Sequence, residues 1–298
     1  MAAPTPYHPG SRAVQDRVGV REAADHVGRA IGPGIRPVAA AFLELQPMLV
    51  LGAADGGGRI WASLLTGRPG FVRATGPHQI SVTGHPAGTD PLAGALTATG
   101  TRVGTIALDP RTRRRMRLNG AARPTPRGLA VEAEQVFSNC PKYLQRRELE
   151  EYVEETAQPA PAGAVRRGDR LVPGQEEFVR AADTFFVATT GPDGVDASHR
   201  GGNPGFVRVT SSTTLEWRDY PGNSMFLTLG NLEADPRAGL LFVDWAHGGT
   251  LQLSGTARTV YAAGERTLRF TLERTVWSEG ASPLRWSAPD YSPANPPR

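Results

Sequence analysis

GRPGFVR, residues 67–73, returns 135 positions later as GNPGFVR, residues 202–208, with only the second residue changed. The same offset joins Gly104 to Gly239 and Arg123 to Arg258. An offset that stays constant along so much of the chain predicts two copies of one fold rather than an array of short repeats. Where the two copies differ, the differences indicate which copy carries a functional site.

The composition fits two β-rich domains. A chain of 298 residues exceeds the usual size of one domain, and its 35 glycines and 26 prolines suit many short strands joined by turns. Turn sequences such as DGGG at residues 55–58 and GPDG at residues 191–194 separate the predicted strands. Strands at this spacing are typical of a barrel or sandwich.

Charge and cysteine content exclude several classes of protein. The formal net charge of +4 favours anionic small molecules at least as much as nucleic acid, and no nucleic-acid module is visible. One cysteine excludes a disulfide within the chain, and no Cys/His cluster has the spacing of metal ligands. Neither a membrane-spanning apolar run nor a signal sequence is present, so we expect a soluble, cytoplasmic protein without a membrane partner.

The organisation follows from the two copies. Residues 131–154 are rich in Glu, Gln, Leu and Arg, which favours a helix between the copies, and residues 157–164 form an Ala/Pro/Gly linker. We therefore expect an N-terminal surface or disordered arm with a short helix (1–35), a diverged first repeat (36–125), a helical connector and linker (126–171), a second repeat with the site (172–275) and an extended tail (276–298).

The strongest candidate site is the polar, Gly-rich corner Ser198-His199-Arg200-Gly201. Backbone amides and an arginine at such a corner can approach an anion closely. The first copy has two leucines, residues 64–65, in place of the His-Arg pair. The pair is therefore specific to the second copy, although capping of a barrel end is an alternative reading.

Three other features are weaker. Asn223 and Ser224 could donate to phosphate oxygens from a turn, or could belong to an ordinary Pro-Gly turn. The arginine run at residues 111–117 is interpreted as a solvated hairpin tip. Cys140 has no second cysteine to resolve it and is interpreted as a buried structural thiol.

Several segments together resemble the pyridoxamine 5'-phosphate oxidase family, and more narrowly its bacterial flavin-nucleotide-binding branch. These segments are residues 198–209, 219–223, 230–242 and 253–257, together with residues 139–143 and 7–15. The resemblance implies a mainly β (α+β) fold of two tandem FMN-binding split β-barrels that pack as a pseudo-dimer, with short peripheral helices.

The resemblance also implies roles for particular residues. Ser198, His199 and Arg200 fall on the strand that contacts flavin and phosphate in the family, and Gly201 ends that strand. Asn223 and Ser224 fall where the family places phosphate-binding groups. Relatives commonly carry Arg or Lys there, and this chain offers only a hydroxyl. The phosphate site is weaker for that reason unless Arg200, Arg208 or a first-copy residue such as Arg68 or Arg73 supplies the charge. Thr250 and Gln252 correspond to the strand that faces the isoalloxazine edge.

We therefore expect a flavin-dependent oxidoreductase that binds about one FMN per chain, mainly through the second copy. The flavin would carry the redox step, since no residue stands out as a catalytic acid or base. The alternatives are a non-catalytic flavin carrier, or the same fold with deazaflavin (F420) or haem. The small-molecule substrate or electron donor, a redox partner and a homodimer are left open.

Overall fold

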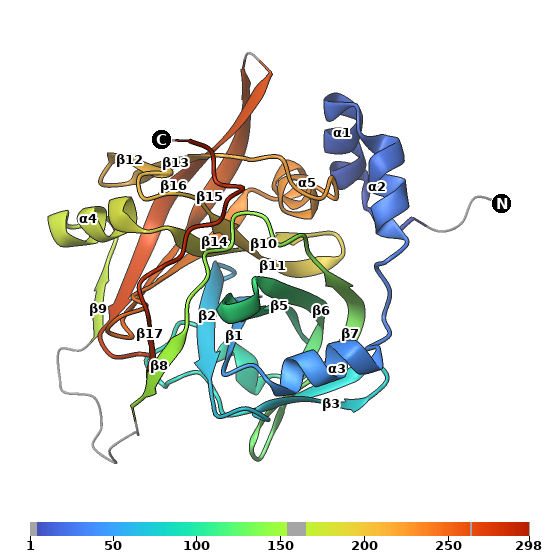
Figure 1. The fold of residues 1–298 in the computed structure, drawn as a ribbon, viewed down its shortest axis with the longest axis vertical. Helices are drawn as coiled ribbons and strands as arrows, with labels where there is room; N and C mark the ends of the chain where they lie inside the picture. Colours follow the sequence, from blue (N-terminus) through green and yellow to red (C-terminus); the bar gives the residue numbers. More distant parts are fainter. Residues whose placement is uncertain (1–4, 154–164, 263, 298) are drawn as a thin grey trace.

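The computed structural model describes residues 5–153, 165–262 and 264–297, and within them the protein is built mainly from two large antiparallel sheets. In Figure 1 the first sheet, coloured blue to green, lies below the second, coloured yellow to red. The two sheets are those of two tandem split β-barrels, as predicted, with short helices around them.

The first sheet has the strand order β2-β1-β5-β6-β7-β4-β3. Its strands are β1 (Met48–Ala54), β2 (Ile60–Thr66), β3 (Val72–Gly76), β4 (Gln79–Thr83), β5 (Thr101–Asp109), β6 (Arg114–Thr125) and β7 (Gly128–Ser138).

The second sheet has the order β11-β10-β14-β15-β16-β13-β12, with β9 paired to β16. Its strands are β9 (Val165–Gly168), β10 (Thr184–Gly191), β11 (Gly194–Gly201), β12 (Val207–Ser211), β13 (Thr214–Arg218), β14 (Arg237–Val243), β15 (Thr250–Ala262) and β16 (Glu265–Ser278). Replacing β1–β7 by β10–β16 in chain order converts the first order into the second, so both copies have the same topology.

The equivalence extends to an irregularity within the sheets. The register shifts between Asn119 and Gly120 in β6, and between Ser254 and Gly255 in β15. A Cβ atom on Gly120 would lie 1.8 Å from a carbonyl oxygen of the paired strand, and one on Gly255 would lie 2.0 Å from such an atom. Both copies therefore need glycine at this bulge.

Alternation along the strands creates three apolar layers. In β10, Phe185 and Val187 pack into the core of the second repeat, whereas Phe186 and Ala188 pack into a separate cluster. That cluster also contains Val50 and other residues of β1 and β5. Because successive side chains of a strand point to opposite faces, each central strand fills its own core and the layer between the repeats.

Two shared glycines set the distance between the repeats. A Cβ on Gly104 would lie 2.5 Å from the Cα of Asp196, and one on Gly239 would lie 2.6 Å from the Cα of Trp61. Trp61 and Asp196 are themselves 135 positions apart. A glycine of each repeat thus packs against the equivalent strand of the other repeat, β11 for Gly104 and β2 for Gly239, which is the pattern of an isologous pair.

The helices lie at the periphery (Figure 1). They are α1 (Pro9–Val18), α2 (Arg21–Gly28), α3 (Pro37–Glu44), α4 (Pro173–Ala181) and α5 (Leu227–Ala234). Helix α1 contacts α5 so closely that a Cβ on Gly10 would lie 2.3 Å from the carbonyl oxygen of Gly230.

The expected N-terminal arm is wrong for the described residues, because Pro9–Val18 is a helix. His8 caps it by accepting from the backbone N–H of Gly10, and proline stands in the first turn, where its missing N–H costs nothing. Val14 and Gln15 are buried against the second repeat. The side chain of Gln15 also donates to the carbonyl of Met225 at 2.9 Å.

The expected helical connector is also wrong. Residues 128–138 form β7, which is hydrogen-bonded to β6 on one side and to β4 on the other. Hydrogen bonding to a strand on each side stabilises the extended conformation more than the weak helix preference of Glu and Gln favours a helix. The first sheet therefore continues past residue 125, and β8 (Leu149–Tyr152) later pairs with β17 (Leu284–Trp286). The expected linker at residues 157–164 lies outside the described residues.

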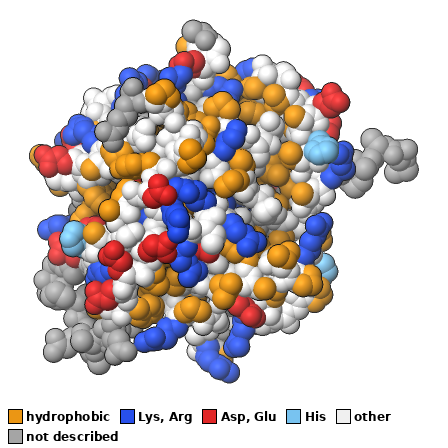
Figure 2. Space-filling model, in the orientation of Figure 1, with side chains coloured by type: hydrophobic (Ala, Val, Ile, Leu, Met, Phe, Trp, Pro, Cys, Tyr) orange, Lys and Arg blue, Asp and Glu red, His pale blue; other side chains and the backbone are white. Residues whose placement is uncertain are grey.

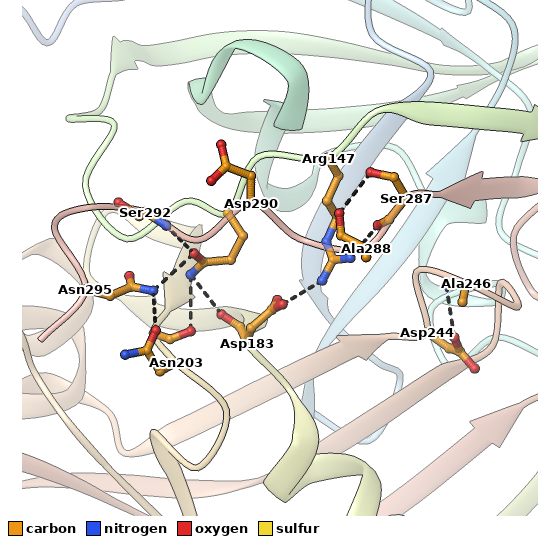
Figure 3. A network of polar contacts seen from close by, with 12 residues as sticks. Arg147, Asp183, Asn203, Asp244, Ala246, Ser287, Ala288, Asp290, Ser292 and Asn295 are labelled. Atoms are coloured by element: carbon orange, nitrogen blue, oxygen red, sulfur yellow. Dashed lines mark hydrogen bonds and ion pairs between the residues drawn. The ribbon is translucent and has the colours of Figure 1, made fainter. Parts of the chain in front are cut away.

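A polar network joins the segment after β7 to the C-terminal tail (Figure 3). Arg147 forms a buried ion pair with Asp183 at 2.6 Å and donates to the carbonyl of Ser287. The side-chain oxygen of Gln145 accepts from Ser292 and Asn295. Its amide nitrogen donates to the carbonyl of Gly202 at 3.2 Å, so the network supports the Gly-rich corner.

The visible surface mixes the two signs of charge. Figure 2 shows Lys and Arg side chains interspersed with Asp and Glu across the centre of this face. Within the described residues, no helix has the length and apolar character that crossing a bilayer requires.

Candidate functional site

The Gly-rich corner follows directly from β11. The strand ends at Gly201, and the N–H of Gly202 donates to the carbonyl of Asp183 at 3.0 Å. A Cβ on Gly201 would lie 2.0 Å from the carbonyl oxygen of Tyr143. Glycine is therefore required here because the backbone after β7 crosses the end of β11 in direct contact.

His199 is the central buried side chain of this corner. It is 4% exposed, and its Nδ1 lies 2.6 Å from a terminal nitrogen of Arg115. A guanidinium can only donate, so Nδ1 accepts and the ring proton is on Nε2. Burial, together with the charges of Arg115 and Arg200, holds the pKa of His199 well below its usual value. The ring is therefore neutral at pH 7.

Arg115 and Arg200 lie near this histidine, and Arg117 lies near both of these arginines. Arg200 donates to the hydroxyl of Ser198 at 2.8 Å and to the carbonyl of His199 at 3.0 Å. Arg115 also donates to the carbonyl of Cys140 at 2.7 Å. Arg117 is 4% exposed and forms a buried ion pair with Asp196.

The arginines are close enough to affect one another. Burial, followed by repulsion from Arg200 and Arg117, lowers the pKa of Arg115 to about 9. Burial is also the main cause of a lowered pKa for Arg200. The Nε atoms of all three side chains, and Nε2 of His199, are buried without a hydrogen-bond partner among the described residues.

The interpretation of residues 111–117 as a solvated hairpin tip is therefore wrong for Arg115 and Arg117. Their side chains alternate along β6 with residues of the first repeat's core and point between the repeats. The sequence contained a signal for this position, because Arg115 and Arg117 are the offset partners of Thr250 and Gln252. In an isologous pair, β11 of one repeat faces the strand equivalent to β15 in the other repeat.

Residues 218–229 form a further wall. Ser224 and Phe226 have positive φ angles of 62° and 54°, and Tyr143 on the opposite side has φ of 65°. Such left-handed conformations are uncommon outside glycine and cluster at functional sites. The rings of Tyr143 and Tyr220 lie 5.1 Å apart, and both are partly exposed.

These walls enclose one cavity of about 100 Å³, which we name the His199 pocket. Six of the eight predicted site residues line it: Ser198, His199, Arg200, Gly201, Asn223 and Ser224. Other lining residues were not assigned to the site from the sequence, and they include Arg115, Arg117, Asn139, Cys140, Tyr143, Asp219 and Tyr220. Cys140 is partly exposed on this lining and is not a buried thiol.

The structure does not bring Thr250 and Gln252 to the lining of the His199 pocket, and their position at the isoalloxazine edge stays a prediction. Gln252 lies across the pseudo-twofold axis and donates to the carbonyl of Ala62 and the hydroxyl of Ser63, both at 3.0 Å. Thr250 is buried on the same strand, at the position equivalent to Arg115.

Gln252, Ser63 and Asp90 form a compact group that we name the Asp90 cluster. Asp90 accepts from Ser63 at 2.7 Å, from Gln252 at 3.1 Å and from the backbone N–H of Leu92 at 2.8 Å. Burial raises the pKa of Asp90 although these hydrogen bonds oppose the shift. The Asp90 cluster occupies the place in the first repeat that is equivalent to the His199 pocket. There the donors Ser63 and Gln252 are hydrogen-bonded to a carboxylate of the chain itself.

Comparison with known proteins agrees with the resemblance. Residues 171–286 match the family model described as pyridoxamine 5'-phosphate oxidase. Over these residues the chain is therefore similar to the pyridoxamine 5'-phosphate oxidase family. The match includes the second-repeat walls of the His199 pocket and excludes Arg115 and Arg117. No curated protein sequence matches the chain.

Three of the similar solved structures each correspond to little more than one repeat. HupZ of Group A Streptococcus is 14% identical over 35% of this chain and 90% of its own, with a TM-score of 0.29. A FAD-binding protein from Mesorhizobium loti is 12% identical over 38% and 96%, with a TM-score of 0.29. HutZ, the haem storage protein from Vibrio cholerae, is 14% identical over 37% and 96%, also with a TM-score of 0.29. Similarity at this level carries no inference about the ligand of this chain.

Proposed function

We propose that the chain is an FMN-binding oxidoreductase that holds the phosphate of one FMN in the His199 pocket. One observation carries this proposal. Four side chains that line this one cavity each bury a donor without a partner among the described residues: the Nε–H groups of Arg115, Arg117 and Arg200, and the Nε2–H of His199. An anion is the ligand that satisfies such a set.

Arginines of the first repeat can also replace the basic residue that relatives carry at the position of Ser224. Relatives place Arg or Lys where this chain has Ser224, and here Arg115 and Arg117 of the first repeat bring guanidinium groups to the same cavity. Both repeats would then contribute to one phosphate site. Arg200 and Ser198 would bind the phosphate from the corner of the second repeat.

The cavity fits the anionic end of the cofactor better than the whole cofactor. A volume of about 100 Å³ suits a phosphate group. Pockets that enclose a drug-sized ligand span roughly 300–1,000 Å³. The partly exposed Tyr143–Tyr220 pair would have to move to admit the ring system. When bound, FMN would supply the redox chemistry, while the protein binds, orients and shields it from water.

We infer a single flavin per chain because the equivalent place in the first repeat is already satisfied. In the Asp90 cluster, Ser63 and Gln252 donate to a carboxylate, and two leucines (residues 64–65) stand in place of His199 and Arg200. A second phosphate there would meet a buried acidic group.

Among the alternatives, haem is the least suited to His199. A histidine that binds iron must offer a lone pair, and here Nδ1 is engaged by Arg115 while Nε2 carries the proton. A deazaflavin shares the need for a phosphate site, and a flavin carrier would need the same pocket without turnover.

The visible spectrum and flavin content of the purified chain test the proposal first. Flavin absorbance bands and about one FMN per chain are expected. A Soret band, or two equivalent flavins per chain, would contradict it. Anaerobic reduction by NAD(P)H followed by reoxidation then separates an oxidoreductase from a carrier.

A double variant tests the location. His199→Leu with Arg200→Leu copies residues 64–65 of the first repeat and removes two of the donors. We expect FMN affinity to fall by at least about tenfold, the equivalent of one charge-assisted hydrogen bond. Ser63→Ala, at the equivalent strand of the Asp90 cluster, is the matched control and should leave FMN affinity unchanged. Unchanged retention in the double variant would place the flavin elsewhere.

A further inference from the structure

A second and larger cavity lies on the first repeat, beside the His199 pocket. It is bounded by the segment that joins α2 to α3, by α3 itself and by the ends of β6 and β7 near residues 112–116 and 136–141. Its volume of about 640 Å³ falls within the range of pockets that enclose small organic molecules. We name it the Phe42 pocket.

The floor of the Phe42 pocket is apolar. Phe42, Met116, Val136 and Phe137 line it and are all buried. At the rim, Val38 is 64% exposed and adds apolar surface beside this floor. A ligand with an apolar body would bury this surface and gain the corresponding hydrophobic free energy.

The rim of the Phe42 pocket is cationic. Five arginines line it, and no Asp or Glu does: Arg29, Arg36, Arg113, Arg114 and Arg115. Arg113 is paired with Asp290. Within the described residues no carboxylate is paired with Arg36 or with Arg114. The guanidinium of Arg114 lies over the ring of Phe42, 5.3 Å from its centroid, and leaves its edge available to an acid.

The two pockets share a wall. Arg115 and Asn139 line both, and Arg115 is the residue that holds His199 and the carbonyl of Cys140. The side-chain oxygen of Asn139 is buried without a partner among the described residues. A molecule in the Phe42 pocket would therefore touch side chains that also contact the ligand of the His199 pocket.

We propose that the Phe42 pocket is a separate site for a small aromatic acid, with its ring on Phe42 and Phe137 and its carboxylate or sulfonate at Arg36 and Arg114. The apolar floor selects the ring, and the unneutralised rim selects the negative charge. This inference does not depend on which ligand occupies the His199 pocket.

Fluorescence titration with 8-anilinonaphthalene-1-sulfonate tests the site in the full chain. We expect Arg36→Ala combined with Arg114→Ala to weaken binding by at least about tenfold, and the wild-type affinity to fall as salt is added. Arg73→Ala removes an exposed arginine on β3, outside both pockets, and should bind the probe like the wild type. Equal affinity in the double variant and in Arg73→Ala would overturn the proposal.

A second titration, with FMN, separates this site from the flavin site. FMN affinity should be nearly unchanged in Arg36→Ala/Arg114→Ala, while the probe is lost. Loss of both ligands together, with direct competition between them, would make the Phe42 pocket part of the flavin site and overturn the inference. If the wild type binds the probe but no FMN, the proposed function fails and the inference stands. Because Arg36, Arg114 and Arg73 are exposed, the double variant Arg36→Ala/Arg114→Ala and the control Arg73→Ala should keep the thermal unfolding midpoint of the wild type.

Discussion

The His199 pocket lies where the end of β11 in the second repeat faces β6 of the first repeat. The Asp90 cluster lies where the end of β2 in the first repeat faces β15 of the second repeat. The two places are related by the offset of 135 residues, and they handle charge in opposite ways. The His199 pocket gathers positive groups and leaves their Nε donors without partners among the described residues. The Asp90 cluster gathers neutral donors around one carboxylate of the chain.

This difference shows what duplication within one chain allows. In a homodimer of identical barrels, a residue change alters both sites. Here Gln252 and Arg117 occupy equivalent strand positions, and only Arg117 carries a charge. Fusion of the copies let one site become a closed polar cluster, while the other kept a cavity.

The largest effect is expected where the equivalent positions differ in charge. Arg117→Ala leaves the buried Asp196 without its ion-pair partner, with only the amide of Asn119 still donating to it, and should lower the free energy of unfolding by about 3–5 kcal/mol. Gln252→Ala removes the hydrogen bonds of an uncharged donor and should cost about 1–3 kcal/mol. Urea unfolding of both variants measures the contrast. Equal losses would show that the two positions are energetically alike.

The shared glycines should respond alike. Gly104→Ala and Gly239→Ala each place a Cβ within 2.6 Å of backbone atoms of the other repeat. Overpacking of this kind costs typically about 1–3 kcal/mol. Because the contacts are related by the pseudo-twofold, the two losses should agree within about 0.5 kcal/mol. The measurement is again urea unfolding. A substitution that leaves stability unchanged at only one of the two glycines would show that the two contacts are not equivalent.

The two sites should give stability profiles of opposite sign against pH. The folded pKa of His199 is depressed, so its contribution is present above about 6.5 and is lost as pH falls toward the folded value. The folded pKa of Asp90 is raised, so its contribution is present below about 3.8 and is lost as pH rises through the folded value. Each slope can reach about 1.4 kcal/mol per pH unit.

Unfolding free energies of the wild type, His199→Leu and Asp90→Asn between pH 4 and 8 test this contrast. The difference between wild type and His199→Leu should grow with pH up to about 6.5. The difference between wild type and Asp90→Asn should shrink as pH rises. Parallel slopes in the two variants would remove the electrostatic distinction between the sites.

The smallest effects are expected at the arginines that both copies retained. Arg73 and Arg208 are exposed, and Arg208 pairs with Glu216 across neighbouring strands. Glu216 is buried but keeps Arg269 as a second partner, so loss of the exposed Arg208 should cost about 0–1 kcal/mol. Alanine at either position should lower the free energy of unfolding by no more than about 1 kcal/mol and leave FMN retention unchanged. A marked loss of flavin in Arg208→Ala would extend the site beyond the described pocket.

The repeat made the fold predictable, because a constant offset and turn residues at regular intervals survive the divergence of side chains. The corner at Ser198–Gly201 was also visible, since it is the place where the copies differ most beside an unchanged segment. Arg115 and Arg117 were not recognised from local sequence, because an arginine run beside a turn looks solvent-exposed. Their burial comes from packing of one repeat on the other, which the local sequence does not show. Thr250 and Gln252 were assigned from the family resemblance, and Gln252 lies in the Asp90 cluster.

The apolar layer between the repeats has a consequence for how the chain can be divided. Phe186 and Ala188 of β10 cover Met48 and Val50 of β1, so a half expressed alone would present this surface to water and aggregate or self-associate. Fragments covering residues 1–153 and 165–298 should instead recover the native contacts when produced together. The molecule is therefore suited to split-protein complementation, in which restored ligand binding reports that the two halves have met.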